Sequence, residues 1–434
     1  MTKMKRLLLS FLAGLFAVVI TAQPSARQEL RKNVQCSAGN SWAYPIPAQQ
    51  KLTPAPAGKR PFYMSHIGRH GSRYQNNSRD YRYALDMLEK ADSRGKLSNL
   101  GKDVMKRLRL IHEDAQDRLG ELSPLGAQQQ KEVASRMVKN FPELFEGDAM
   151  IDAHSTSVLR CVFSMENTLQ QLIAINPKLR ISHKATLNDM RLLYYFDREL
   201  MEKAASLQQR ETYEKYCKEH ACWQRVASSL FNDTTYLRES ANGERLNYYL
   251  FRTAGSIQNT DLRDRVTLYD LFTTEEIYEN WRAENVFWFL GYGTSALNGG
   301  VLPYSQRYLL RQLIADADSC IQQERPGVML RFGHDTSLIP LICLMDIDHY
   351  GQSIDDLDQL EEKGWANYRI CPMGANIQMV FYRSDFNDND ILVKVLLNEN
   401  EATLPVKTDV APYYHWSDVR DFYLKKLDAY EQKK

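Results

Sequence analysis

Hydrophobic positions along this chain follow the short period of strands in some stretches and the longer helical period in others. Compact apolar runs predict strands at residues 61–67, 149–154 and 328–332. Apolar stripes with helical spacing predict helices at residues 80–90, 99–119, 124–141, 158–173 and 303–323. Ser123 is a favourable cap for a helix that starts at Pro124. The chain is therefore predicted to alternate strands with helices over most of its length.

The two ends of the chain carry different patterns. Residues 377–382 and 391–397 predict two strands of a hairpin, joined by a polar loop. Ser417 is a candidate cap for a terminal helix that runs to about residue 430. Residues 23–58 are polar and contain Pro45, Pro47, Pro54 and Pro56. This segment is predicted to be an extended lead-in that crosses the surface.

The middle of the chain changes character at about residue 188. Charged and aromatic residues mix there without a clear strand pattern, and Thr273 with Glu276 forms a capping-box sequence that predicts a helix start. A chain of 434 residues is long for one domain. We therefore expect residues 188–285 to form a mainly helical cap, inserted into a core made of residues 23–187 and 286–434.

The N-terminal residues 1–22 have the pattern of a signal peptide. Lys3, Lys5 and Arg6 precede an apolar run that is too short to span a bilayer comfortably, and Ala22 offers a small residue for cleavage. Cleavage there removes three of 55 basic residues and none of the 54 acidic ones, leaving 52 against 54, a net charge of −2. The mature protein is predicted to be exported, periplasmic or secreted, and without stable membrane insertion. A retained N-terminal anchor is the alternative.

Charge and cysteine content narrow the possible partners and cofactors. The near-neutral balance gives no overall basic field for nucleic acid. Of seven cysteines, Cys161, Cys320 and Cys343 lie in apolar contexts typical of core thiols, and Cys217 and Cys222 could pair only across a turn. None of the spacings suits a zinc site with histidines, so we expect no bound metal.

Candidate catalytic residues follow three of the predicted strands. Arg69, His70 and Arg73 lie at the end of the strand at residues 61–67, Arg160 lies in the first turn of the helix at 158–173, and His334 with Asp335 follows the strand at 328–332. Guanidinium groups match phosphate oxygens, and a helix N-terminus also favours an anion. Because ligands gather at the carboxyl ends of strands in an open α/β sheet, these side chains are predicted to converge on one pocket.

The ordered set of motifs resembles the histidine acid phosphatases, the branch of the histidine phosphatase superfamily that includes phytases and multiple inositol-polyphosphate phosphatases. The motifs that carry the resemblance are residues 69–73, 120–126, 155–164, 334–335 and 372–377. The inositol-polyphosphate branch usually has His-Ala-Glu where this chain has His334-Asp335, which places the chain nearer the ordinary acid phosphatases and phytases. The resemblance implies a three-layer α/β sandwich, with a largely parallel central sheet flanked by helices and an inserted helical cap.

The resemblance also implies a mechanism without metal or cofactor. His70 would attack phosphorus as a neutral imidazole and form a phosphohistidine, and the surrounding positive charge should lower its pKa. Arg69, Arg73, Arg160 and His334 would bind the phosphate oxygens. Asp335 would protonate the leaving oxygen of a small phosphate monoester and therefore has to be protonated at the start of a turnover.

Two other functions use the same residues. A protein that binds a phosphorylated ligand without turnover needs only the arginine pocket, and a phosphotransferase would use the same phosphohistidine. Among substrates, phytate, other inositol phosphates and sugar phosphates are candidates. Arg79, Arg82 and Lys184 are candidate rim cations by charge alone.

Overall fold

The structure is a computed structural model that describes residues 24–49, 51–194 and 197–433. The predicted signal peptide lies outside these residues. The strands are β1 Arg60–Arg69, β2 Met150–Ser155, β3 Arg180–Lys184, β4 Gly327–Gly333, β5 Asn376–Arg383, β6 Leu392–Leu397, β7 Asn400–Glu401 and β8 Tyr413–His415. The α-helices are α1 Ala26–Lys32, α2 Ser78–Asp92, α3 Asn99–Ala115, α4 Pro124–Asn140, α5 Leu159–Ile175, α6 Leu187–Leu193, α7 Arg198–Ala204, α8 Leu207–Glu219, α9 Gln224–Leu230, α10 Thr234–Ser240, α11 Gly243–Ile257, α12 Thr274–Tyr292, α13 Arg307–Ile321, α14 Asp335–Met345, α15 Asn367–Ile370 and α16 Trp416–Glu431. The 3-10 helices are η1 Val34–Ser41, η2 Pro142–Phe145, η3 Tyr269–Leu271, η4 Ala296–Asn298, η5 Leu302–Gln306, η6 Ile347–His349 and η7 Leu357–Gln359.

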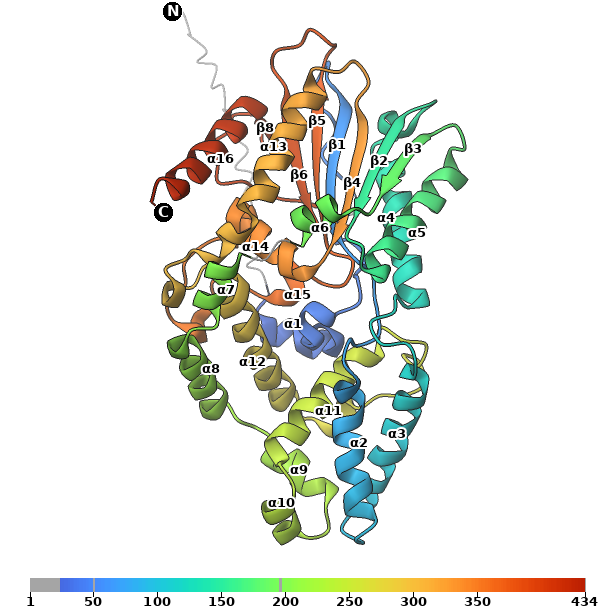
Figure 1. Cartoon of the computed structure of the whole chain (residues 1–434), viewed down its shortest axis with the longest axis vertical. Helices are drawn as coiled ribbons and strands as arrows, with labels where there is room; N and C mark the ends of the chain where they lie inside the picture. The colour runs from blue at the N-terminus through green and yellow to red at the C-terminus, as the bar shows by residue number, and fades with distance from the viewer. Residues whose placement is uncertain (1–23, 50, 195–196, 434) are drawn as a thin grey trace, which may run out of the picture.

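A single sheet in the order β3-β2-β4-β1-β5-β6-β7, with β8 also paired to β6, organises one half of the molecule (Figure 1). The strands β3, β2, β4 and β1 are parallel, whereas β5 to β8 pair antiparallel. The α/β fold is as predicted, and so is the hairpin of β5 and β6. The prediction of a largely parallel sheet holds only for the half that ends at β1, because β5 joins β1 in the opposite direction and β6, β7 and β8 then add as antiparallel neighbours.

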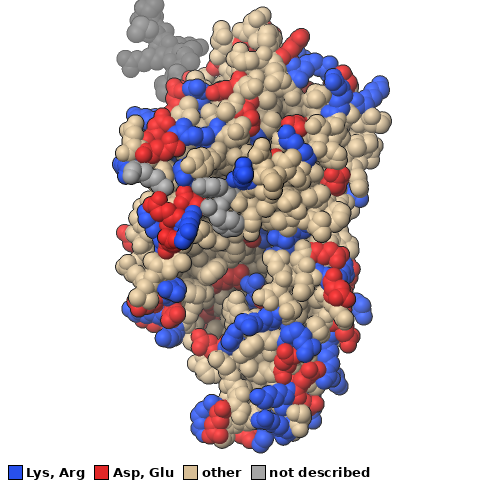
Figure 2. Space-filling view, in the orientation of Figure 1, with Lys and Arg blue, Asp and Glu red and all other residues tan. Residues whose placement is uncertain are grey.

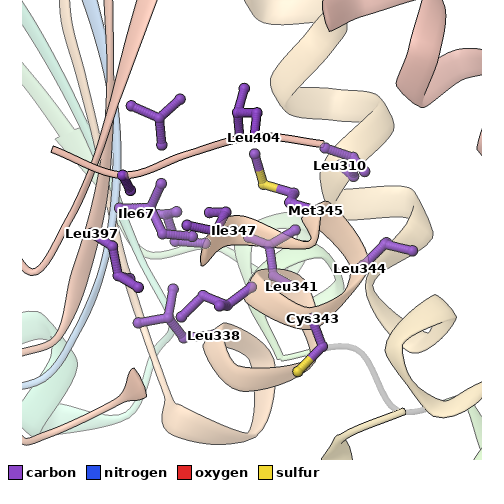
Figure 3. Close-up of a cluster of buried hydrophobic side chains, with 14 of the residues drawn as sticks. Ile67, Leu310, Leu338, Leu341, Cys343, Leu344, Met345, Ile347, Leu397 and Leu404 are labelled. Carbon is purple, nitrogen blue, oxygen red and sulfur yellow. The ribbon is translucent and has the colours of Figure 1, made fainter. Parts of the chain in front are cut away.

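Helices cover both faces of this sheet, and alternate residues along a strand pack against the helices of one face or the other. Met64 of β1 packs with α4 and α5 on one face, whereas Tyr63 and Ile67 pack with α13, α14 and α16 on the other. Figure 3 shows part of the second layer, in which side chains of α14 lie between Ile67 and Leu397 of the sheet and Leu310 of α13. The helices on both faces hold the parallel strands in place, so the positions at which these strands end are fixed.

A second, helical half lies beyond the carboxyl ends of the parallel strands (Figure 1). Its core joins α2 and α3 to α9, α11 and α12, so this helical lobe draws on residues 78–115 as well as on the predicted insertion. The capping box of Thr273 and Glu276 is present at the start of α12, and Ser123 caps α4 as predicted. Ser417 was expected to cap the last helix, but α16 begins at Trp416 and its cap position is His415, two residues before Ser417.

The segment that precedes β1 departs most from its predicted form. Its first part folds into α1 and η1 instead of an extended lead-in, and Ser25 forms a capping box with Gln28 at the start of α1. Residues 36–40 are buried where η1 packs on α11, α12 and α15. The prolines that suggested an extended chain all follow η1, so extended backbone is confined to the later residues.

All seven cysteines are unpaired, and the three expected core thiols are buried. Within the described ranges, no helix has the length and apolar character needed to cross a membrane. The same residues contain no cluster of three or more His, Cys, Asp or Glu side chains placed to hold a metal ion.

Candidate active site

Three neighbouring parallel strands end together at the edge of the sheet that faces the helical lobe. Arg69 is in register with Gly333, and Ser155 is in register with Phe332. The chain that follows each strand therefore enters the same space, and the six residues singled out from the sequence meet there. The ring centroids of His70 and His334 are 5.7 Å apart.

Close backbone packing fixes the loop that carries His70 and Arg73. A Cβ on Gly71 would lie 2.4 Å from the carbonyl oxygen of Gly126, and a Cβ on Gly126 would lie 2.1 Å from that of Ser72. Only glycine allows this approach. The Ser123 amide donates to the Ser72 carbonyl at 2.9 Å, so the start of α4 holds the loop against the end of β1.

His70 is buried and oriented by one hydrogen bond. Its Nδ1 lies 2.9 Å from the carbonyl oxygen of Gly71, which can only accept, so Nδ1 carries the proton and Nε2 keeps its lone pair. Burial lowers the pKa of His70 well below its usual range, and the charges of Arg69, Arg160 and Arg73 lower it further. The predicted direction is confirmed, with burial as the larger cause. His70 is thus a neutral imidazole even in mild acid.

Three guanidinium groups surround this imidazole, and some of their N–H groups have no hydrogen-bond acceptor among the described residues. Arg69 is fully buried, and its Nη1 donates to the Cys371 carbonyl at 3.0 Å. The buried Nε atoms of Arg69, Arg73 and Arg160 have no hydrogen-bond partner within the described chain. Burial and its two arginine neighbours lower the pKa of Arg73 to about 9, which leaves it cationic at neutral and acidic pH. Unpaired donors and concentrated positive charge make this a site for an oxyanion such as phosphate.

His334 lies between Arg160 and the end of β2. Arg160 Nη2 is 3.3 Å from its Nδ1, and the Thr156 hydroxyl is 3.2 Å from its Nε2. Burial and the charge of Arg160 lower its pKa to about 3, so the ring is neutral. Its Nε2–H donates to Thr156, while Nδ1 accepts from Arg160.

Asp335, the first residue of α14, is held as a carboxylate. Its Oδ2 accepts from Arg69 Nη2 at 2.6 Å and from the side-chain amide of Asn40 at 2.8 Å, and its Oδ1 accepts from the Thr336 amide at 2.9 Å. Burial by itself raises the pKa of Asp335, but Arg69, Arg73 and His334 outweigh burial, and the net pKa is lowered. The sequence led to the expectation that Asp335 is protonated at the start of a turnover, whereas the ligand-free site favours its carboxylate form.

Two residues of the site were not assigned a role from the sequence. Asn40 belongs to η1; its carbonyl accepts a hydrogen bond from Arg69 while its side chain reaches Asp335. Thr156 orients His334 from the turn between β2 and α5. Both act through polar contacts with residues that are distant in the sequence, for which a hydrophobic pattern carries no signal.

The three cations suggested for the rim of the substrate pocket, Arg79, Arg82 and Lys184, are not part of this cluster. Lys184 lines a separate groove beside Asp152 and His154 on the outer part of the sheet. Arg82 forms an ion pair with Asp86 on the surface of α2. Arg79 is exposed in the first turn of the same helix.

Comparisons with known proteins were made for sequence and for structure. Residues 64–398, more than half of the chain, match the family model described as histidine phosphatase superfamily (branch 2). A search of curated protein sequences finds no match.

Solved structures share the fold at low sequence identity. The multiple inositol polyphosphate phosphatase of Bifidobacterium longum, in complex with inositol hexasulfate, aligns with a TM-score of 0.76 and 16% identity over 89% of this chain and 97% of its own. The phytase of D. castellii aligns with a TM-score of 0.65 and 15% identity over 96% of this chain and 90% of its own. The apo phytase of Hafnia alvei aligns at 0.53 and 12% identity over 86% and 98%. The His334-Asp335 pair suggested the phytase side of the family, whereas the backbone superposes better on the first of these structures.

Proposed function

Because the chain belongs to branch 2 of the histidine phosphatase superfamily and is therefore a phosphatase, we propose that it hydrolyses phosphate monoesters through a phosphohistidine on His70. The observation that carries the proposal is the single pocket in which three guanidinium groups with unpaired Nε donors surround a neutral, oriented imidazole. A nucleophile and its electrostatic partners are thus placed together.

The first half of the reaction is an in-line attack by His70 Nε2 on phosphorus, with departure of the alcohol oxygen. Arg69, Arg73 and Arg160 neutralise the charge that spreads over the three equatorial oxygens in the transition state. His334 holds Arg160 in place through Nδ1, and it would contact the same oxygens once its Nε2–H turns from Thr156 to the bound phosphate. In the second half, water attacks the phosphohistidine and releases inorganic phosphate, which restores His70.

Asp335 is proposed as the acid that protonates the leaving oxygen. A phosphate dianion that binds Arg69 competes with the carboxylate for that guanidinium and adds negative charge nearby, and both effects raise the pKa of Asp335. Substrate binding itself thus favours the protonated form, and acidic pH increases its population. After transfer, the carboxylate can accept a proton from the attacking water.

Export and metal independence are further parts of the proposal. The pattern of residues 1–22 supports export to the periplasm or medium, and N-terminal sequencing of mature protein is expected to start beyond Ala22. A first residue of Met1 would contradict cleavage. The arginines supply the neutralising charge that a metal provides in other phosphatases, so a chelator should leave the rate unchanged.

The direct test is phosphate release from phenyl phosphate with a chelator present, by the native protein and by His70→Ala. The variant is expected to lose about 10³-fold or more in kcat, whereas His183→Ala, at an exposed histidine of β3, should retain full activity. Saturable ligand binding without release between acidic and neutral pH would instead indicate a binding protein. Transfer to an added alcohol in preference to water would indicate a phosphotransferase.

A further inference from the structure

A large cavity lies in the helical lobe. Figure 2 shows this face of the molecule hollowed below the sheet-bearing half, where Figure 1 places α8, α11 and α12. The cavity has a volume of about 670 Å³ and is lined by these three helices and by residues 220–223. It is large enough for a drug-sized organic group.

The cavity is linked to the site residues in two ways, one through charge and one through aromatic rings. On one side, Arg252 lines the cavity, pairs with Asp80 of α2 at 3.0 Å, and adds to the charge that lowers the pKa of Arg73. On the other side, Trp288 lines the cavity and stacks on Tyr292, with ring centroids 5.0 Å apart.

Tyr292 also lies near Asp335 and near Tyr194, the ring that packs on His334. Burial raises the pKa of Tyr292, and the nearby Asp335 and Tyr194 raise it further. The ring of Tyr194 lies 4.6 Å from that of His334. Tyr292 thus stacks on Trp288 of the cavity wall and lies within the electrostatic reach of Asp335, the proposed acid that protonates the leaving oxygen.

The cavity wall contains several large aromatic side chains, together with three carboxylates and two arginines. The aromatic residues are Tyr213, Trp223, Tyr248, Phe251, Phe287 and Trp288. The three carboxylates are Glu244, Glu279 and Glu284, and both arginines of the wall are already engaged: Arg252 with Asp80, and Arg245 over the rings of Tyr83 and Tyr249. Burial raises the pKa of Glu284, and the charge of Arg252 and the side chain of Trp288 oppose this rise.

We propose that this cavity receives the leaving group of the substrate, and that the preferred substrate is a phosphate monoester of an aromatic, otherwise uncharged alcohol. The inference rests on the proposed phosphatase function. Rings of the wall offer stacking and apolar contact to a flat group. A leaving group with several further phosphates would bring them against three carboxylates and two arginines that are already paired, so phytate is a poor substrate in this account.

The test compares 2-phenylethyl phosphate, ethyl phosphate and phytate as substrates of the full-length enzyme. The first two esters share a primary alkyl leaving oxygen and differ in the ring. The value of kcat/KM is expected to be roughly tenfold higher for the phenylethyl ester than for the ethyl ester, and lowest for phytate. Hydrolysis of ethyl phosphate reports the proposed phosphatase function by itself, so failure of that function is distinguishable from failure of this inference.

Variants locate the effect in the cavity. Trp288→Ala should bring the ratio of the two kcat/KM values down toward one, whereas Phe386→Ala, in the loop at the opposite end of the sheet, should keep the native ratio. Glu284→Gln removes a carboxylate from the cavity wall, so it should raise kcat/KM for phytate several-fold. A native ratio near one, a ratio unchanged in Trp288→Ala, or phytate as the best of the three substrates would overturn the inference.

Discussion

The hydrogen bond from Asn40 to Asp335 offers a sharp test of how the proton of the leaving group is controlled. The Asn40 side-chain amide is 2.8 Å from Asp335 Oδ2 and favours the ionised carboxylate. Asn40→Ala removes this donor and keeps the backbone carbonyl that accepts from Arg69. A hydrogen bond to a charged group contributes about 1.5–3 kcal/mol. Since one pH unit corresponds to about 1.36 kcal/mol, the proton affinity of Asp335 should rise by about one to two pH units.

The sign of the effect follows from the role of Asp335 as an acid. A carboxyl group that keeps its proton to higher pH extends activity upward, so the basic limb of the kcat/KM profile should move to higher pH. The assay measures ethyl phosphate hydrolysis at several pH values for the native enzyme, Asn40→Ala and the control Asn167→Ala. Asn167 is a half-buried asparagine of α5 whose side-chain amide donates to the Phe163 carbonyl. Ionisation of the substrate is common to all three and cancels. A basic limb that stays in place or moves to lower pH would refute the acid role of Asp335 or its control by Asn40.

Two further predictions concern stability. Gly126→Ala places a Cβ 2.1 Å from the Ser72 carbonyl oxygen, so it should lower the free energy of unfolding by about 1–3 kcal/mol and remove most of the activity. The control Gly291→Ala, whose Cβ meets nothing within 4 Å, should leave stability and activity intact. Equal effects of the two substitutions would contradict the packing argument. Hydrogen bonds to Asp152 and Asp189 raise the pKa of His154. The stabilisation of the fold by protonated His154 is therefore complete below the pKa of free histidine, and it is lost as pH rises through the raised pKa. His154→Gln should therefore lower Tm more at about pH 5.5 than at about pH 8.5, by at most about 1 kcal/mol in unfolding free energy, and the reverse order would contradict the pairing.

The catalytic cluster could be predicted because its residues follow strands. Arg69, His334 and Arg160 each come just after an apolar run or at the start of a periodic helix, and parallel strands bring such positions to one edge. The pattern of β5 and β6 likewise predicted a hairpin. It did not predict that half of the sheet is antiparallel, because strand order depends on which edge a later segment joins.

The hydrophobic pattern of the sequence could not predict Asn40 or the residues of the cavity wall as parts of the site. Asn40 lies in a short 3-10 helix with no hydrophobic period, and its contact with Asp335 spans 295 positions in the sequence. The lowered pKa of Asp335 depends on Arg69 and Arg73, whose distance from this carboxylate no hydrophobic pattern specifies. The cavity wall likewise combines residues of α8, α11 and α12, whose packing the sequence pattern does not specify.

The most direct test of the account is to trap the phosphorylated enzyme. The native enzyme is mixed with excess phenyl phosphate, quenched in alkali during turnover, where phosphohistidine survives, and digested for mass spectrometry. We expect the peptide that contains His70 to carry one phosphoryl group, with the same label in His183→Ala and none in His70→Ala. Turnover without a label on His70, or a label that persists in His70→Ala, would contradict the account.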